Sequence, residues 1–194
     1  MPDQANFTPP ASWLDLPDAA PTPEVAAVYA RTKDKLGYVR HNQRATAHRP
    51  ALTLAQDAMS RAVNSDDTSG LTRRERELIA LVVSVENRCT PCVFAHAAAL
   101  RDATGDTLRV ARIEVNFRHA DLSARERALA DYAVRITCAP GEIEPADLDK
   151  LRYAGVSEAE ILDAAGVAAY FNFSNRLNSA LGVPPNDEAY AVGR

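Results

Sequence analysis

Apolar residues recur at helical spacing along most of the chain. After residue 22 one segment places its apolar side chains on a single helical face: Val25, Val28, Tyr29 and Leu36. Thr22 is a suitable N-cap for this helix, Pro23 suits its first position, and Gly37 ends it. A second stripe follows Pro50 and consists of Leu52, Ala55, Met59 and Ala62. The pattern predicts consecutive amphipathic helices.

Three later helices are predicted from capping boxes, in which a Ser or Thr caps the first turn and a Glu three residues on reaches back. The pairs are Thr72 with Glu75, Ser123 with Glu126, and Ser157 with Glu160. The first two begin similar segments, LTRRERELIALVVSV from residue 71 and LSARERALADYAVRI from residue 122. This similarity indicates a duplicated helical hairpin. No segment shows sustained period-2 alternation, so the expected fold class is all-α.

The expected organisation is one helical domain over residues 24–182, an extended arm over 1–23 and a C-terminal tail over 183–194. Residues 1–23 hold six of the twelve prolines, which exclude regular helix or a central strand there. The arm also carries apolar residues that could anchor it: Phe7, Trp13, Leu14 and Leu16. We expect the arm to pack on its own body or on a neighbouring subunit.

Composition limits the classes of partner. The chain has 194 residues, enough for one domain that needs neither a disulfide nor a metal to fold. Its net charge of −4 gives no reason to expect nucleic acid or an anionic membrane as partner. The longest strongly apolar run, 78–83, is too short to span a membrane, and no signal peptide is recognisable, so we expect a cytoplasmic protein.

The candidate chemistry lies just after the first copy of the capped helix, where Cys89, Cys92 and His96 have the spacing C-x-x-C-x-x-x-H. In a reducing compartment a close cysteine pair is more often catalytic or metal-binding than structural. Pro91 should keep Thr90 out of helical geometry and start the next helix, with Cys92 in its first turn. The helix dipole there should lower the pKa of the Cys92 thiol.

Two further groups can serve this pair. His96 lies one turn after Cys92 on the same face, so its imidazole should reach the thiol directly or through a water. Glu77 faces His96 if the two helices form an antiparallel hairpin, because both residues lie about two turns from the connection. The simpler interpretation of Glu77 is a solvated charge in a charged cluster.

Other interpretations of the motif remain open at this point. A buried cysteine pair can be part of the core, and a lone histidine is often only a satisfied polar residue. A structural zinc usually needs a second pair of ligands, whereas Cys138 is a lone third cysteine that we assign to the core. The pair could also exchange disulfides with a protein partner, or form part of a non-catalytic oligomeric module that holds a metal or ligand. We predict a redox dithiol with no metal and no cofactor.

These residues resemble the AhpD-like alkylhydroperoxidase group of the carboxymuconolactone decarboxylase superfamily, whose motif is a Glu, eleven residues and then C-x-x-C-x-x-x-H. Glu77, Cys89, Cys92 and His96 match it at every spacing. The likeness covers residues 36–185 and includes LGYVRHNQRATAHRP and AAYFNFSNRLNSALGV, which resemble the branch of peroxidase-related proteins.

The resemblance implies an all-helical homo-oligomer and an antioxidant dithiol peroxidase that reduces hydroperoxides. It implies that Cys92 is oxidised to a sulfenic acid, that Cys89 resolves it as a disulfide, and that His96 and Glu77 relay protons. An external dithiol or a protein reductant would then reduce the disulfide. AhpD proteins often carry a second His between the two cysteines, where this chain has Thr90-Pro91. Family members with lactone decarboxylase activity lack the cysteine pair, so that activity is not predicted.

Overall fold

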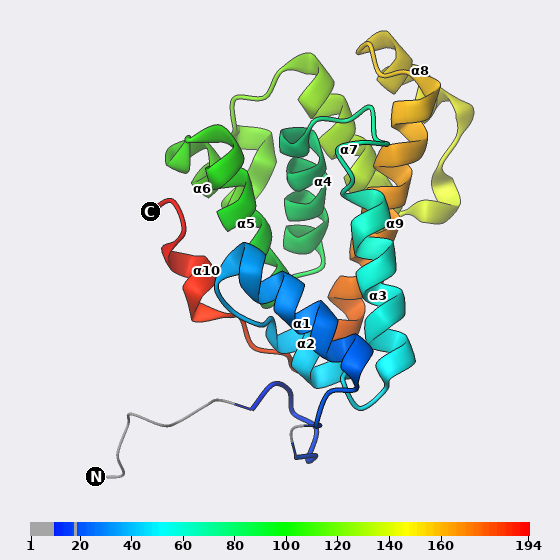
Figure 1. Ribbon diagram of the computed structural model, residues 1–194. Helices are drawn as coiled ribbons and strands as arrows, with labels where there is room; N and C mark the ends of the chain where they lie inside the picture. Colours follow the sequence, from blue (N-terminus) through cyan, green and yellow to red (C-terminus); the bar gives the residue numbers. More distant parts are fainter. Residues whose placement is uncertain (1–9, 18) are drawn as a thin grey trace.

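The computed structural model describes residues 10–17 and 19–194, and these residues form helices and no strand (Figure 1). The α-helices are α1 (Pro23–Leu36), α2 (His41–Thr46), α3 (Pro50–Val63), α4 (Arg73–Glu86), α5 (Thr90–Thr104), α6 (Thr107–Asn116), α7 (Ala124–Cys138), α8 (Pro145–Tyr153), α9 (Glu158–Ala180) and α10 (Asp187–Ala191). Two short 3₁₀ helices, η2 (Phe117–His119) and η3 (Pro140–Glu142), precede and follow α7. The all-α fold class is confirmed.

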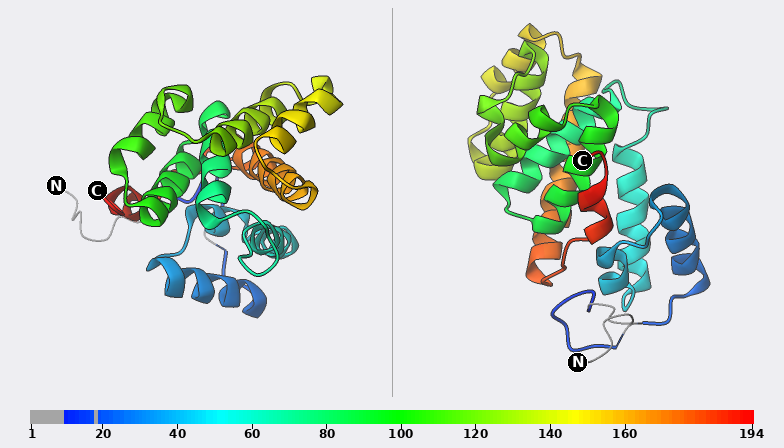
Figure 2. Two further views of the ribbon diagram at one scale, coloured as in Figure 1. Left: turned by 90° about the horizontal axis from the view of Figure 1, so that it is seen from above. Right: turned by 90° about the vertical axis from the view of Figure 1, so that its left-hand side faces the viewer.

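Helix α4 lies at the centre of the molecule and contacts α5, α6, α7 and α9 (Figures 1 and 2). Its apolar run is completely enclosed: Leu78, Ile79, Ala80, Leu81, Val82 and Val83 are each at most 1% exposed. Fully burying one such Leu, Ile or Val side chain contributes roughly 1.5–3 kcal/mol. The helices α1, α2 and α3 form a smaller group that packs on this body through α3 and α9.

The starts predicted for four of the helices, α1, α4, α7 and α9, are confirmed. The Thr22 side chain accepts the Val25 N–H at the start of α1, and Gly37 ends that helix with a φ of 86°. The three predicted capping boxes begin α4, α7 and α9, and each has both of its reciprocal hydrogen bonds. Capping boxes are predictable because a few neighbouring residues satisfy the free N–H groups of the first turn.

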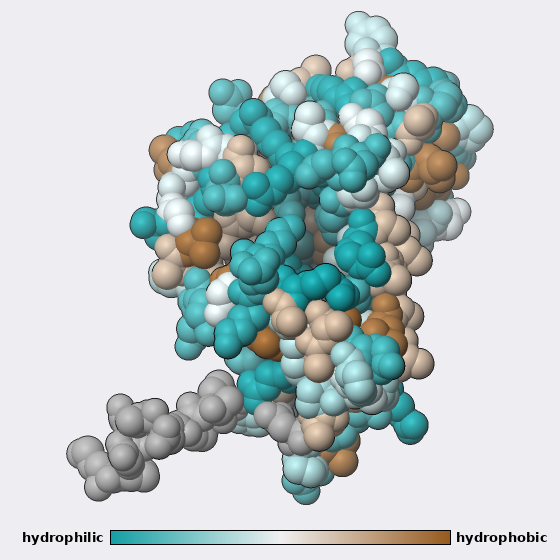
Figure 3. Space-filling view, viewed as in Figure 1, coloured by the Kyte–Doolittle hydropathy of each residue, from teal (hydrophilic) through white to brown (hydrophobic). Residues whose placement is uncertain are grey.

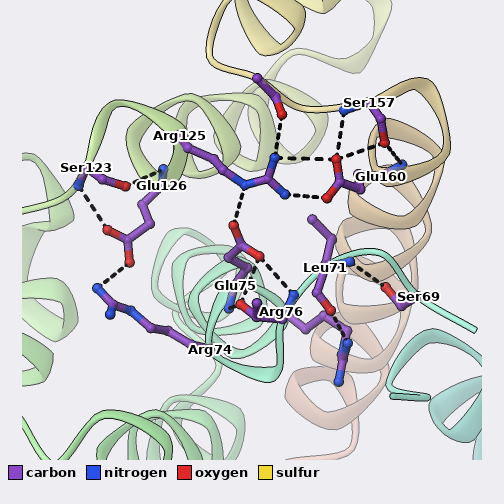
Figure 4. A network of polar contacts seen from close by, with 12 residues as sticks. Ser69, Leu71, Arg74, Glu75, Arg76, Ser123, Arg125, Glu126, Ser157 and Glu160 are labelled. Atoms are coloured by element: carbon purple, nitrogen blue, oxygen red, sulfur yellow. Dashed lines mark hydrogen bonds and ion pairs between the residues drawn. The ribbon is translucent and has the colours of Figure 1, made fainter. Parts of the chain in front are cut away.

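The two similar helices, α4 and α7, are tied together by exchanged ion pairs (Figure 4). Arg125 of α7 donates through Nε to Glu75 of the α4 capping box at 2.6 Å. In return, Arg74 of α4 lies 2.7 Å from Glu126 of the α7 capping box. Arg125 also reaches Glu160 in the α9 capping box at 2.6 Å, so one guanidinium links two helix starts. The two similar segments identified in the sequence therefore contact each other in the fold, and each binds the capping box of the other.

The described part of the N-terminal arm contacts the body, whereas Phe7 lies outside the described residues. Ala11 is 6% exposed and packs with Ala45 and Val183. The Trp13 N–H donates to the Leu181 carbonyl at 2.8 Å, and its ring lies against Gly182, where a Cβ would overlap it. Leu14 and Leu16 remain exposed and do not anchor the arm. The contact is therefore made by Ala11, the Trp13 backbone and one part of the Trp13 ring, although Trp13 as a whole is 82% exposed.

The last residues of the chain fold back onto α5 (Figure 2). Arg101, which is 3% exposed, donates through Nε to the Val192 carbonyl at 2.8 Å. The rings of Phe94 and Tyr190 lie 5.6 Å apart. The segment expected to be a tail thus includes α10 and a set of specific contacts.

The surface in Figure 3 is mainly hydrophilic, and its apolar patches are small and separate. Among the described residues, no helix combines the length and the apolar character that crossing a membrane requires.

Candidate redox site

The two candidate cysteines lie where α4 turns into α5. Arg88 has a φ of 53°, a left-handed conformation that is uncommon outside glycine, and it reverses the chain after α4. Cys89 is the extended N-cap of α5, and its N–H donates to the Ser84 carbonyl at 3.0 Å. The prediction that Thr90 stays outside the helix is wrong by one residue. Cys89 takes the non-helical conformation, so the helix begins at Thr90 with Pro91 in its first turn.

The cysteines are free thiols in hydrogen-bond contact, with Sγ atoms 3.0 Å apart. Cys89 is 0% exposed and Cys92 is 6% exposed. A disulfide has an S–S length of about 2 Å, so a movement of roughly 1 Å would join the two sulfurs. The two cysteines are therefore positioned to form a disulfide across the first turn of α5.

The first proton of the pair is held more weakly by Cys89 than by Cys92. A hydrogen bond from the Cys92 side chain, opposed by burial and helped by the Cys92 backbone N–H, lowers the pKa of Cys89 to about 7. The hydrogen bond to Cys89, burial and the charge of Cys89 raise the pKa of Cys92 well above its usual value. The prediction that Cys92 has the lowered pKa is wrong. The Cys92 and Val93 N–H groups of the first turn donate to the Cys89 carbonyl at 3.1 and 2.9 Å, and neither cysteine side chain caps the helix.

Glu77 and His96 meet as the hairpin geometry predicted. His96 Nδ1 lies 2.8 Å from Glu77 Oε2, and both side chains are 15% exposed. The edge of the His96 ring also contacts Phe171, with ring centroids 4.3 Å apart. Glu77 is therefore not a fully solvated charge. Among the hydrogen bonds of the described residues, none joins His96 to either sulfur, so the expected direct contact with Cys92 is not present.

Helix α9 contributes a group that the sequence analysis missed. Asn178 is 3% exposed, and its Nδ2 donates to Cys92 Sγ at 3.2 Å. A second missed residue is Arg40, at the N-cap of α2, whose positive charge opposes the raised pKa of Cys92. The only sequence signal for Asn178 is the regular spacing of Asn172, Asn175 and Asn178 in NFSNRLN. Local patterns do not show which helix faces the cysteines.

Cys138 does not belong to the core. It is exposed at the last residue of α7, with Sγ 3.9 Å from Glu86 Oε2. Its assignment as a buried core residue is wrong because the end of α7 lies at the periphery, where no element covers this side chain. Across residues 10–17 and 19–194, no three His, Cys, Asp or Glu residues are grouped as metal ligands.

The sulfurs are enclosed in this structure. Neither cysteine lines the void under Arg74 and Arg109 or the cavity of about 160 Å³ beside Tyr29 and Arg44. Access to Cys92 from solvent is limited to its 6% exposed surface. A small reactant fits this degree of access better than a folded protein does.

Comparison with known proteins places this geometry in a family context. Residues 50–114 match the model of the carboxymuconolactone decarboxylase family. The alkylhydroperoxidase AhpD core structure of an uncharacterized peroxidase-related protein from Ralstonia eutropha JMP134 is 34% identical, with a TM-score of 0.91. That alignment covers 96% of this chain and 98% of the other. An uncharacterized peroxidase-related protein from Silicibacter sp. TM1040 is 38% identical, with a TM-score of 0.89, and the alignment covers 97% and 100% of the two chains.

A more distant similarity extends to a debrominase. The debrominase Bmp8 is 19% identical with a TM-score of 0.73, and the alignment covers 88% of this chain and 90% of the other. At that identity the similarity shows the fold alone. No curated protein matches the chain in sequence.

Proposed function

Since this chain belongs to the AhpD-like group of the carboxymuconolactone decarboxylase superfamily, we propose that it is a dithiol peroxidase that reduces hydroperoxides. The observation that carries the proposal is the pair of reduced thiols, Cys89 and Cys92, 3.0 Å apart at the start of α5. The peroxidase-related proteins with which it aligns along nearly its whole length support the same class of chemistry.

In the first step, Cys92 attacks the terminal oxygen of the hydroperoxide. Cys89 carries the negative charge of the resting pair and takes the Cys92 proton across the 3.0 Å hydrogen bond. A sulfur–oxygen bond forms as the oxygen–oxygen bond breaks, which gives the Cys92 sulfenic acid and an alkoxide. Cys92 suits this role because it is the more exposed sulfur, and a thiolate of higher pKa is the stronger nucleophile.

The alkoxide leaves as an alcohol once it receives a proton. We assign this proton to His96, whose imidazole is oriented by Glu77 at 2.8 Å and is 15% exposed. The carboxylate stabilises the protonated imidazole, and solvent then restores the proton. The relay acts on the leaving oxygen in this scheme and does not require contact between His96 and the sulfur.

In the second step, the Cys89 thiol attacks the Cys92 sulfenic acid. The disulfide forms and the hydroxyl leaves as water with the Cys89 proton, so two thiols and one hydroperoxide give a disulfide, an alcohol and water. An external dithiol or a protein reductant must reverse this oxidation by thiol–disulfide exchange. A reducing compartment such as the cytoplasm would supply it. Homo-oligomeric assembly, which the resemblance implies, is part of the proposal.

The proposal is tested by steady-state consumption of tert-butyl hydroperoxide with a dithiol reductant. We expect activity in the parent, activity at the parent level in Cys138→Ser, and loss of at least roughly a thousandfold in Cys92→Ser, because the attacking atom is gone. Full activity in Cys92→Ser would contradict the proposal. A parent whose Cys92 reacts with peroxide no faster than an unactivated thiol would instead favour disulfide exchange with a protein partner.

A further inference from the structure

Helix α9 brings two polar side chains to the reacting pair: Ser179 acts on Cys89, and the amide of Asn178 contacts Cys92. Its Nδ2 donates to Cys92 Sγ at 3.2 Å, across 86 positions of sequence. The residue is 3% exposed, and the Val183 N–H donates to its backbone carbonyl at 3.0 Å. The backbone of Asn178 is therefore held by a hydrogen bond, and the amide nitrogen of its side chain contacts the Cys92 sulfur.

The other end of the same amide is unsatisfied. Asn178 Oδ1 is buried and has no hydrogen-bond partner among residues 10–17 and 19–194. Nearly all buried polar atoms in folded proteins are paired, and a lone buried acceptor costs roughly 1–3 kcal/mol. A buried acceptor without a hydrogen-bond partner beside a reactive sulfur is typical of a binding site in which the ligand donates the missing hydrogen bond.

We propose that Asn178 is a catalytic residue that binds the hydroperoxide itself, with Oδ1 accepting the hydrogen of the O–O–H group while Nδ2 holds the sulfur. This inference rests on the proposed peroxidase function and names the group that recognises its substrate. The oxygen that carries the donated hydrogen is the terminal one, which Cys92 attacks. Because Nδ2 and Oδ1 are bonded to one carbon, the amide brings the attacking sulfur and the attacked oxygen to adjacent positions.

The same contact supports the nucleophile. Burial and the neighbouring Cys89 raise the pKa of Cys92, and the Asn178 hydrogen bond acts in the opposite direction, as does the charge of Arg40. A hydrogen bond to a developing thiolate is charge-assisted and therefore stronger than one between neutral groups. Asn178 thus has two separable effects: one on the sulfur through Nδ2 and one on the peroxide through Oδ1.

Two probes separate these effects. Tert-butyl hydroperoxide has the O–H hydrogen that Oδ1 would accept, whereas iodoacetamide has no such group and reports only the reactivity and access of the thiol. For Asn178→Leu, and for Asn178→Ala as a smaller change, we expect Cys92 oxidation to slow by about 10- to 100-fold, because the hydrogen bond to the sulfur and the hydrogen bond to the peroxide are both lost. Alkylation should slow by a clearly smaller factor.

Asn175→Leu is the matched control. Asn175 lies one turn earlier on α9, is 0% exposed and also has an unpaired amide atom, Nδ2, but it makes no hydrogen bond to either cysteine. We expect the rates of Cys92 oxidation and of Cys92 alkylation in Asn175→Leu to stay within about twofold of the parent. Equal slowing of oxidation and alkylation in the Asn178 variants, or equal oxidation defects in Asn175→Leu, would overturn the proposal. So would oxidation of Asn178→Leu at the parent rate.

Failure of the proposed function has a different signature. If tert-butyl hydroperoxide oxidises the parent no faster than an unactivated thiol, the peroxidase proposal and the peroxide contact of Oδ1 are both wrong. The iodoacetamide rates then still show whether Asn178 activates Cys92. If the parent reacts rapidly and the Asn178 variants do too, only the role of Asn178 is wrong.

Discussion

Helices α4 and α7 begin with the same capping contacts, but the residues that follow the two helices differ. Both start in a capping box, and each box accepts an arginine of the other helix (Figure 4). With the caps aligned, Glu77 corresponds to Ala128, Cys89 to Pro140, Cys92 to Ile143 and His96 to Asp147. The shared part is therefore the framework, and the proposed redox groups belong to one copy only. This difference separates residues that hold the fold from residues that we propose carry the reaction.

The largest effect on turnover among these comparisons is expected where only the first copy carries a group that we propose to be catalytic. His96→Asn should lower hydroperoxide turnover by roughly 10²-fold, the usual contribution of a positioned acid or base, and Glu77→Gln should have a smaller effect of the same sign. Asp147→Asn, at the position that matches His96 in the second copy, should leave turnover unchanged. Steady-state kinetics of the three variants checks this, and equal losses at His96 and Asp147 would remove the distinction between the copies.

The shared framework should respond in stability and not in turnover. Arg125→Met removes the bonds to Glu75, Glu160 and the Gly155 carbonyl, and we expect it to destabilise the fold by about 1–3 kcal/mol, because Glu75 stays buried without this partner. Arg74→Met should have a smaller effect, since Arg109 also binds Glu126. Urea denaturation measures both. A loss of thiol oxidation rate at full stability would show that the framework takes part in the chemistry.

The two copies should also differ in the pH at which their thiols ionise. The pKa of Cys89 is lowered to about 7, chiefly by the Cys92 hydrogen bond, whereas burial, followed by the nearby Glu86, raises the pKa of Cys138. A protonated Cys89 cannot take the Cys92 proton, so oxidation should slow about tenfold per unit of pH below 7 and level off above it. Thiolate absorbance of the parent and of Cys138→Ser, followed across pH 5–10, would separate the two transitions. One transition above pH 9 for all three thiols would contradict this assignment.

Acid should weaken the framework that the two copies share. Hydrogen bonds from Arg125 hold the pKa of Glu160 at about 2, against an ordinary value near 4.5. A carboxyl whose pKa is lower in the folded state stabilises the fold above its unfolded pKa, and this contribution is lost as the pH falls through its folded value. We therefore expect stability to decline between about pH 4.5 and 2, and to decline less in Arg125→Met. Urea midpoints across this range test the sign, and an equal decline in both proteins would contradict the assignment.

The smallest effect is expected at Cys138. It is exposed at the end of α7 and lies outside the reacting pair, so Cys138→Ser should change stability by less than about 0.5 kcal/mol. Thermal unfolding measures this value. A larger loss would show that the end of α7 is more closely packed than its exposure indicates.

The framework and part of the site could be predicted because they depend on neighbours in the sequence. Capping boxes need only a Ser or Thr and a Glu three residues apart, so the starts of α4, α7 and α9 were identified. The contact between Glu77 and His96 followed from their equal distances to one turn.

The remaining features depend on contacts that a linear pattern does not contain. Asn178 reaches Cys92 from a helix 86 positions away, and Arg40 acts on it from the start of α2. The acidity of the two thiols depends chiefly on the hydrogen bond between them, which lowers the pKa of Cys89 and raises that of Cys92, and the spacing of the cysteines does not show this direction. The exposure of Cys138 depends on what covers the end of α7, which spacing alone does not reveal.

The most direct test of the account is mass spectrometry of the thiols after one equivalent of tert-butyl hydroperoxide is added to the reduced protein. We predict rapid formation of a Cys89–Cys92 disulfide within one chain and a free thiol at Cys138. In Cys89→Ser, which lacks the base that takes the Cys92 proton, we predict slower oxidation that stops at a Cys92 sulfenic acid. Oxidation that begins at Cys138, or a pair that remains reduced while the peroxide persists, would contradict the claim that the chemistry belongs to the first copy alone.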